Sequence, residues 1–206
     1  MSKYNNNCFK SVPCIIGVDQ SYTRTGIAII VNGEIKKIGS INFTNHQHNK
    51  TTKRLEVRRV VGNTLDACLI RFKPDEIVVL CERIRTFTSS FDIRPDFMIS
   101  QGALVACLVD EAYVRGVKTF SVDTRAWKSK VLGTSKPIFE PLEGVENPQK
   151  FGSVRKMIEL GFGEEIKRYK GNGKGKEWKY DDDAADAACI GLYGFAKGPL
   201  TMTLET

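Results

Sequence analysis

Residues 14–30 constrain the fold more than any other stretch of the chain. They read CIIGVDQSYTRTGIAII, where two short apolar runs flank a polar turn that opens with Asp19. Runs of β-branched residues bounded by turn residues are typical of buried strands. An aspartate at the end of a buried strand is costly unless a cation or backbone donors meet its carboxylate. Asp19 is therefore either a turn residue or a metal ligand, and this stretch alone does not decide between the two.

The pattern of apolar residues places further strands along the chain. Strands are expected at about 14–20, 26–32 and 34–43, and Asn32-Gly33 predicts a hairpin turn because both turn positions need positive φ. The chain therefore opens as an antiparallel meander. A fourth strand at 76–81 runs directly into Glu82, which is a second acid at the end of a buried strand. A fifth strand is expected at 117–122.

Helices are expected between these strands and after the last of them. Apolar residues recur at helical spacing over about 52–72, and further helices are expected at about 95–115, 123–132, 151–160 and, from its alanine content, 181–195. The segment 161–179 is rich in glycine and lysine, and we expect it to be poorly ordered without a ligand.

Length and composition fit one globular domain with insertions. The chain has 206 residues, of which 41% are hydrophobic and 27% charged. We expect a leader at 1–12, a single domain at 13–197 with insertions near 133–150 and 163–179, and a tail at 198–206. No apolar run approaches the roughly 20 residues that span a bilayer, and the N-terminus lacks the apolar centre of a signal peptide. A cytoplasmic protein without a membrane partner is therefore expected.

Basic residues are in excess and they cluster. The net charge is +7, with one cluster at 50–59 and another at 167–179 beside three aromatic residues. Such clusters suit a phosphate backbone with bases stacked on the aromatic rings. Nucleic acid is the partner that this pattern favours. The six cysteines form no CxxC pair, so neither a zinc site nor a disulfide framework is expected.

The last predicted helix begins with more acids than a helix start requires. Its sequence is DDDAADAACIGLYGF from residue 181, and capping explains only one or two of the first three aspartates. Asp183 and Asp186 lie three residues apart on one face, where two like charges repel. Asp182 and Asp186 also share a face, so Asp182 remains a further candidate. A cation bound to that face would account for the arrangement.

Four carboxylates are thus expected in one pocket. Parallel pairing of the first and fourth strands would place Asp19 beside Glu82, and the last helix would add Asp183 and Asp186. Carboxylate oxygens suit magnesium or manganese. Two such ions form the clamp used in phosphodiester hydrolysis, so two ions per site are expected.

These motifs resemble the RuvC family of Holliday junction resolvases, within the ribonuclease H-like superfamily. The matching segments are GVDQSYTRTGIAII, LCERI and DDAADAA, in the family's order and at the same element ends. The resemblance implies an α/β, ribonuclease H-like fold with a five-stranded mixed sheet flanked by helices. It makes Asp19, Glu82, Asp183 and Asp186 the catalytic and metal-binding residues, with no small-molecule cofactor.

The resemblance also implies a homodimer that nicks two opposed strands of a four-way DNA junction. The segment VDTRAWKSKVLGTS resembles the family's basic DNA-contacting segment, and the length suggests a phage-type or low-GC bacterial relative. The residues expected to contact branched DNA are Arg83, Arg85, Phe87, Arg125, Lys128, Lys130, Lys167, Lys170, Lys174 and Lys176.

Two departures from the family concern specificity. Gln20-Ser21 stands where Pro-Gly is usual, and Arg85 stands where an aromatic usually wedges into the junction, with Phe87 and Phe91 the nearest aromatics. These departures bear on the family's cleavage-sequence preference more than on hydrolysis, and it is the insertions that would broaden the substrates to other branched DNA.

Three other hypotheses remain. A non-catalytic junction-binding protein would be expected to lack one of the four acids, and none is missing. An actin-like sugar kinase has a similar phosphate-binding turn, but it needs a second such turn and a longer chain. A transposase-like strand transferase would need an additional DNA-binding domain.

Overall fold

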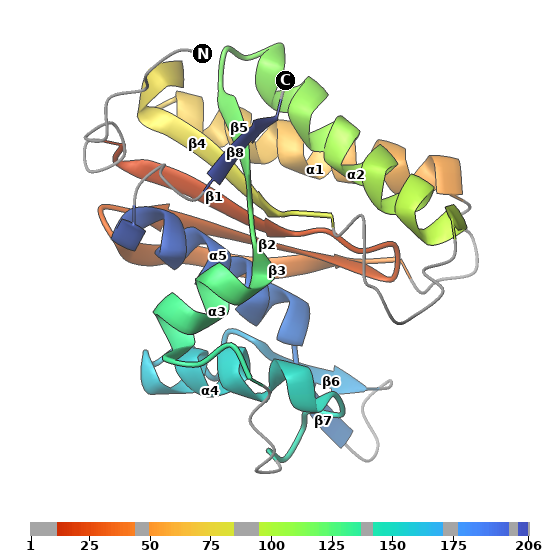
Figure 1. The fold of residues 1–206 in the computed structure, drawn as a ribbon, viewed down its shortest axis with the longest axis vertical. Helices are drawn as coiled ribbons and strands as arrows, with labels where there is room; N and C mark the ends of the chain where they lie inside the picture. The colour runs from red at the N-terminus through yellow and green to blue at the C-terminus, as the bar shows by residue number, and fades with distance from the viewer. Residues whose placement is uncertain are drawn as a thin grey trace.

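The computed structural model describes residues 12–43, 50–84, 95–136, 142–170, 177–197 and 202–205. A mixed sheet with strand order β3-β2-β1-β4-β5-β8 forms its centre (Figure 1). β1, β2 and β3 form the predicted antiparallel meander, and β1, β4 and β5 run parallel to one another. These five strands confirm the predicted five-stranded mixed sheet. The strands of the sheet are β1 (Cys14–Asp19), β2 (Arg24–Val31), β3 (Glu34–Asn42), β4 (Ile77–Glu82), β5 (Lys118–Val122) and β8 (Met202–Glu205).

Helices cover both faces of the sheet. Figure 1 shows α1 and α2 on one face and α5 on the other, with α3 and α4 beyond α5. Each face has its own cluster of buried apolar side chains. The helices are α1 (Lys50–Leu69), α2 (Pro95–Tyr113), α3 (Thr124–Leu132), α4 (Phe151–Glu159) and α5 (Asp182–Lys197), with short 3-10 helices at Pro74–Glu76 and Pro148–Lys150.

Three strands differ from the sequence expectations. β8 pairs antiparallel with β5 and adds a sixth strand within the expected tail. β6 (Lys167–Lys170) and β7 (Glu177–Tyr180) pair as a two-stranded ribbon, whereas poor order was expected there. Backbone pairing and packed aromatic rings stabilise this ribbon despite its charge. The expected leader lies almost wholly outside the described residues.

The turn between β2 and β3 has the predicted form. Asn32 and Gly33 have φ of 52° and 83°, so both occupy the left-handed region. This turn fixes the register in which Val31 faces Glu34 at one end of the hairpin. At the other end, Gly26 faces both Asp19 and Ser40.

Helix α5 approaches the sheet closely at two glycines. A Cβ atom on Gly17 would overlap the backbone of Ala187, and one on Gly26 would overlap the backbone of Asp183. The absence of side chains at these positions lets the start of α5 lie against β1 and β2. Across the described ranges, we find no helix whose length and apolar character together would suit a bilayer crossing.

Candidate active site

The four predicted acidic residues meet at one edge of the sheet. β1 and β4 pair in parallel with Val18 opposite Cys81, so the residues that follow, Asp19 and Glu82, are neighbours. The first turns of α5 add Asp183 and Asp186. All four line a cavity of about 460 Å³. Residues far apart in sequence therefore form one acidic cavity.

A lysine that the sequence analysis missed lies among these carboxylates. The Nζ atom of Lys150 is 2.9 Å from Asp19 Oδ2, 3.3 Å from Asp183 Oδ1 and 2.5 Å from Asp186 Oδ2. Lys150 ends the 3-10 helix that precedes α4. The sequence around Lys150 does not indicate this position, because the carboxylates that its Nζ contacts belong to residues more than 30 positions away. In this structure a cationic group of the chain itself therefore lies among the three aspartates.

Burial, attraction to Lys150 and repulsion among the carboxylates together set the electrostatics of the cavity. Burial raises the pKa of Asp19 to about 8, and the nearby carboxylates of Asp186, Glu82 and Asp183 add to this, while Lys150 opposes it. Burial alone would lower the pKa of Lys150. The three aspartates outweigh that effect and hold its pKa well above the usual value. Lys150 therefore stays charged.

The carboxylate set fits a hard divalent cation. Asp186 gives one oxygen to Lys150, and its other oxygen, Oδ1, is buried without a hydrogen-bond partner. An orphaned carboxylate oxygen is costly, and a cation would satisfy it. Magnesium and manganese take such oxygen ligands. The residues that would hold such an ion are Asp19, Glu82, Asp183 and Asp186, which line the cavity.

Glu82 is held differently from the three aspartates. Trp127 donates its Nε1–H to Glu82 Oε1 at 3.0 Å. The side-chain amide of Gln20 hydrogen-bonds to both backbone groups of Glu82. Sequence reasoning assigned no role to Trp127 and treated Gln20 only as a departure from a family motif.

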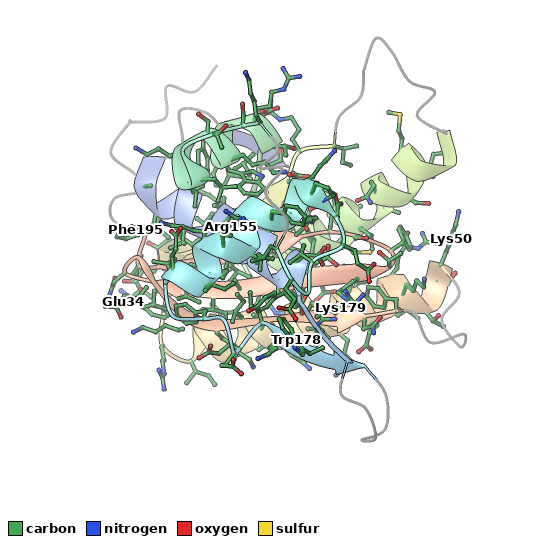
Figure 2. The ribbon with its side chains drawn as sticks, turned by 90° about the horizontal axis from the view of Figure 1, so that it is seen from below. Glu34, Lys50, Arg155, Trp178, Lys179 and Phe195 are labelled. Atoms are coloured by element: carbon green, nitrogen blue, oxygen red, sulfur yellow. The ribbon has the colours of Figure 1, made fainter. Side chains whose placement is uncertain are left out.

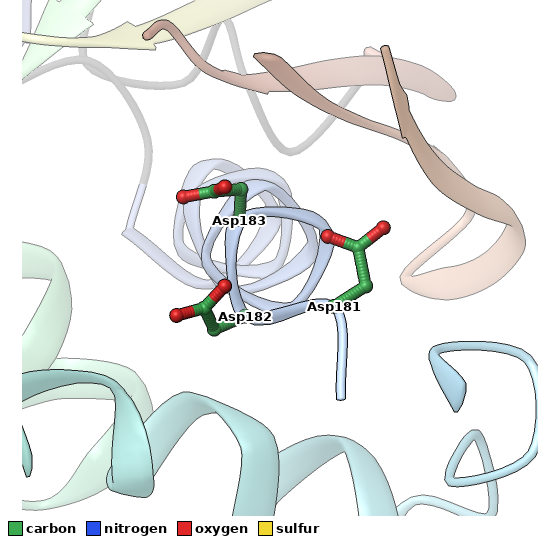
Figure 3. A group of neighbouring side chains, drawn as sticks. All are labelled: Asp181, Asp182 and Asp183. Carbon is green, nitrogen blue, oxygen red and sulfur yellow. The ribbon is translucent and has the colours of Figure 1, made fainter. Parts of the chain in front are cut away.

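A second acidic group, at the start of α5, is not an independent site. One carboxylate oxygen each of Asp181, Asp182 and Asp183 lies within 4.8 Å of the other two. Figure 3 shows the three side chains pointing in different directions around the helix. Asp181 is already used, because it accepts the N–H of Ala184 and pairs with Arg168. Asp182 does not line the cavity of the four acids.

Basic residues expected to contact DNA lie at the rim of the acidic cavity and on α3. Arg83 and Lys128 line the cavity. Arg125 and Lys130 are exposed on α3, whose first turn is capped by Asp123. A positive rim around an acidic cavity suits a phosphate backbone that must approach carboxylates.

The ribbon is anchored by its own side chains. Lys167 pairs with Glu164 and lies over the ring of Trp178, which packs against Gly144 and edge-on to Tyr180. Figure 2 labels Trp178 and Lys179 on this ribbon. The expected DNA contacts at Arg85, Phe87, Lys174 and Lys176, and the side chain of Lys170, lie outside the described residues.

Solved structures with a similar fold are known. Thermus thermophilus RuvC superposes with a TM-score of 0.59 at 15% identity, covering 93% of this chain and 99% of that one. The same protein in complex with a Holliday junction substrate gives 0.59 at 13% identity, with the same coverage. The chain has the RuvC form of the ribonuclease H-like fold. The yeast mitochondrial Holliday junction resolvase Ydc2 gives 0.53 at 16% identity, over 93% of this chain and 82% of that one.

At these identities the similarity concerns the fold. No family model matches the sequence, and no curated protein matches it. The chemistry must therefore be argued from the residues of this chain.

Proposed function

We propose that this chain is a metal-dependent endonuclease that cuts four-way DNA junctions by paired nicks in opposed strands. The observation that carries the proposal is the single cavity in which Asp19, Glu82, Asp183 and Asp186 meet. The fold supports it, since one similar structure is RuvC in complex with a Holliday junction substrate and another is a Holliday junction resolvase.

The four carboxylates would hold two magnesium or manganese ions. Such ions, when bound, polarise the phosphate and make a water molecule acidic enough to attack at neutral pH. Lys150 contacts three of the four acidic side chains in the structure. A divalent cation at the same oxygens would replace some of these contacts, which leaves the ammonium free to bind a phosphate oxygen of the DNA.

The surrounding basic residues would bind the DNA backbone. Arg83 and Lys128 line the cavity, and Arg125 and Lys130 extend the positive surface along α3. The remaining residues proposed for this role, some of them outside the described ranges, are Arg85, Phe87, Lys167, Lys170, Lys174 and Lys176. The net charge of +7 adds long-range attraction for a polyanion.

Paired nicking requires two active centres, so we propose a homodimer. Within the part of the chain that the structure describes, the four predicted acids line one cavity, so one copy of the chain supplies one active centre. On α2, Ile99 and Tyr113 expose 70% and 79% of their surface. Such residues on one helix suit a contact between two copies.

Cleavage of a synthetic four-way junction tests the proposal, with a splayed fork and a linear duplex as controls. Metal-dependent symmetric nicks on the junction alone are the expected result. Equal cutting of the fork would instead show a broader branched-DNA nuclease. Tight binding without cutting in magnesium or manganese would show a non-catalytic junction-binding protein.

A further inference from the structure

We propose that Gln20 and Trp127 are positioning residues that present Glu82 to the acidic cavity as a ligand with one free carboxylate oxygen. The inference rests on the proposed function of that cavity as a metal centre. It concerns residues of this chain to which the motif resemblance assigns no role.

Gln20 continues the sheet with its side chain. The main chain leaves β1 after Asp19, and Gln20 is the next residue, only 8% exposed. Its Nε2–H donates to the Glu82 carbonyl at 2.6 Å, and its Oε1 accepts the Glu82 N–H at 3.2 Å. The amide thus takes the place of a strand backbone and leaves no buried peptide group of Glu82 unpaired on that side.

Trp127 fixes the other end of Glu82. Its ring is fully buried beneath α3, and its Nε1–H donates to Glu82 Oε1 at 3.0 Å. An indole N–H can only donate, so Glu82 is the acceptor in this hydrogen bond. The ring cannot swing away without opening the core. The other carboxylate oxygen of Glu82, Oε2, is then available to bind a metal ion in the cavity.

The two hydrogen-bonding groups are neutral, which separates Glu82 from the other acids. Asp19, Asp183 and Asp186 all contact the ammonium of Lys150. These three aspartates must exchange the Lys150 ammonium for a metal ion. Glu82 can keep its hydrogen bonds to Gln20 and Trp127 when the metal binds. Glu82 is therefore the preset ligand of the site. Partners that orient a metal ligand typically alter metal affinity by roughly 10–100-fold when removed.

The first test is Mn²⁺ affinity of Trp127→Phe, measured by electron paramagnetic resonance of the free ion. Phe keeps an aromatic ring and removes the N–H, and we expect the Kd to rise by roughly 10–100-fold. Trp178→Phe is the matched control, since it makes the same change at the other of the chain's two tryptophans. Trp178 packs against Gly144 and should leave the Kd unchanged. Gln20→Met removes both amide hydrogen bonds without touching the Trp127 pocket, and it should also weaken binding.

A spectroscopic readout distinguishes positioning from general loss of structure. In the Trp178→Phe background, Trp127 is the sole tryptophan, and we expect Mn²⁺ or Mg²⁺ to shift its emission. Adding Glu82→Gln should abolish the shift in a protein that still unfolds cooperatively.

Unchanged Mn²⁺ affinity in folded Trp127→Phe and Gln20→Met would overturn the inference, even if the wild type cleaves junctions. Absence of any Mn²⁺ binding by the wild type would overturn it as well. Weakened affinity in both variants, in a protein that cuts no DNA, would uphold the inference and refute the nuclease proposal.

Discussion

At the scale of single residues, the charge balance of the cavity depends on Lys150. Its ammonium lies within 3.3 Å of carboxylate oxygens from Asp19, Asp183 and Asp186. Removing one partner of a buried ion pair leaves uncompensated charge, which costs about 3–5 kcal/mol. In metal-free buffer we therefore expect Lys150→Met to lower the free energy of unfolding by roughly that amount. Chemical denaturation in the presence of a chelator measures it.

A divalent cation should compensate for the lost ammonium. Adding Mg²⁺ is expected to raise the stability of Lys150→Met more than that of the wild type. Lys156→Met is the control, because Lys156 pairs with the exposed Glu159 at 3.4 Å and should have little effect. Equal loss of stability in both variants, with no response to Mg²⁺, would contradict the prediction.

The protonation of Asp19 makes stability depend on pH. Burial raises its pKa from 3.8 to about 8, so between these values the folded protein binds a proton that the unfolded chain releases. The free energy of unfolding therefore falls as pH rises through this window, by at most about 1.4 kcal/mol per pH unit from this group. Asp19→Asn removes the titration. Without metal, we expect its stability to fall less steeply than that of the wild type.

Urea unfolding with a chelator, at several pH values from about 5 to 8, measures this difference. Relative to the wild type, the free energy of unfolding of Asp19→Asn should increase steadily as the pH rises. Parallel profiles would show that Asp19 is already ionised in the metal-free protein.

At the scale of elements, the site depends on how closely α5 approaches the sheet. A Cβ atom on Gly26 would overlap the backbone of Asp183. Gly26→Ala must therefore displace the start of α5, and with it Asp183 and Asp186. Overpacking of this kind costs about 1–3 kcal/mol. We expect a lower melting temperature together with loss of Mn²⁺ affinity.

Gly39→Ala provides the matched control on β3. An added Cβ there meets nothing within 4 Å, so stability and Mn²⁺ affinity should both be retained. Normal Mn²⁺ affinity in Gly26→Ala would show that the close approach does not position the aspartates.

The glycine-lysine segment between β6 and β7 supplies a second prediction at this scale. Replacing Lys174 and Lys176 with glutamine should weaken junction binding and reduce the slope of log K against log[salt] by roughly 1–2, because fewer counterions are released. Fluorescence anisotropy over a range of salt concentrations measures the slope. The control is the double variant Lys36→Gln, Lys37→Gln, which makes the same charge change on β3 near the β2–β3 turn. Ser40, the β3 residue that Arg168 of the ribbon contacts, lies nearer the other end of the strand. An equal slope change in both double variants would rule out a specific role for the segment.

At the scale of the whole molecule, features carried by neighbouring residues were predictable from the sequence. The Asn32-Gly33 turn needs only its own two residues. Strand-end acids such as Asp19 and Glu82 are marked by the apolar run before each of them. Adjacent parallel strands then place them together, as the register of β1 and β4 confirms.

Features that depend on tertiary contacts were not predictable. Lys150 reaches Asp19 across 131 positions, and Trp127 reaches Glu82 across 45. Neither residue has local neighbours that indicate its partner. The ribbon was missed for a related reason, because its composition indicates disorder while its stability comes from Trp178 packing on Gly144 and Tyr180.

The central claim is that the acidic cavity hydrolyses DNA rather than only binding it. Parallel measurement of nicking and binding by Asp19→Asn on a four-way junction in Mg²⁺ tests this most directly. The account predicts that nicking is abolished while junction affinity stays within a few-fold of the wild type, because Asn keeps the side chain's shape and removes its charge. Loss of binding together with nicking, or nicking at the wild-type rate, would contradict it.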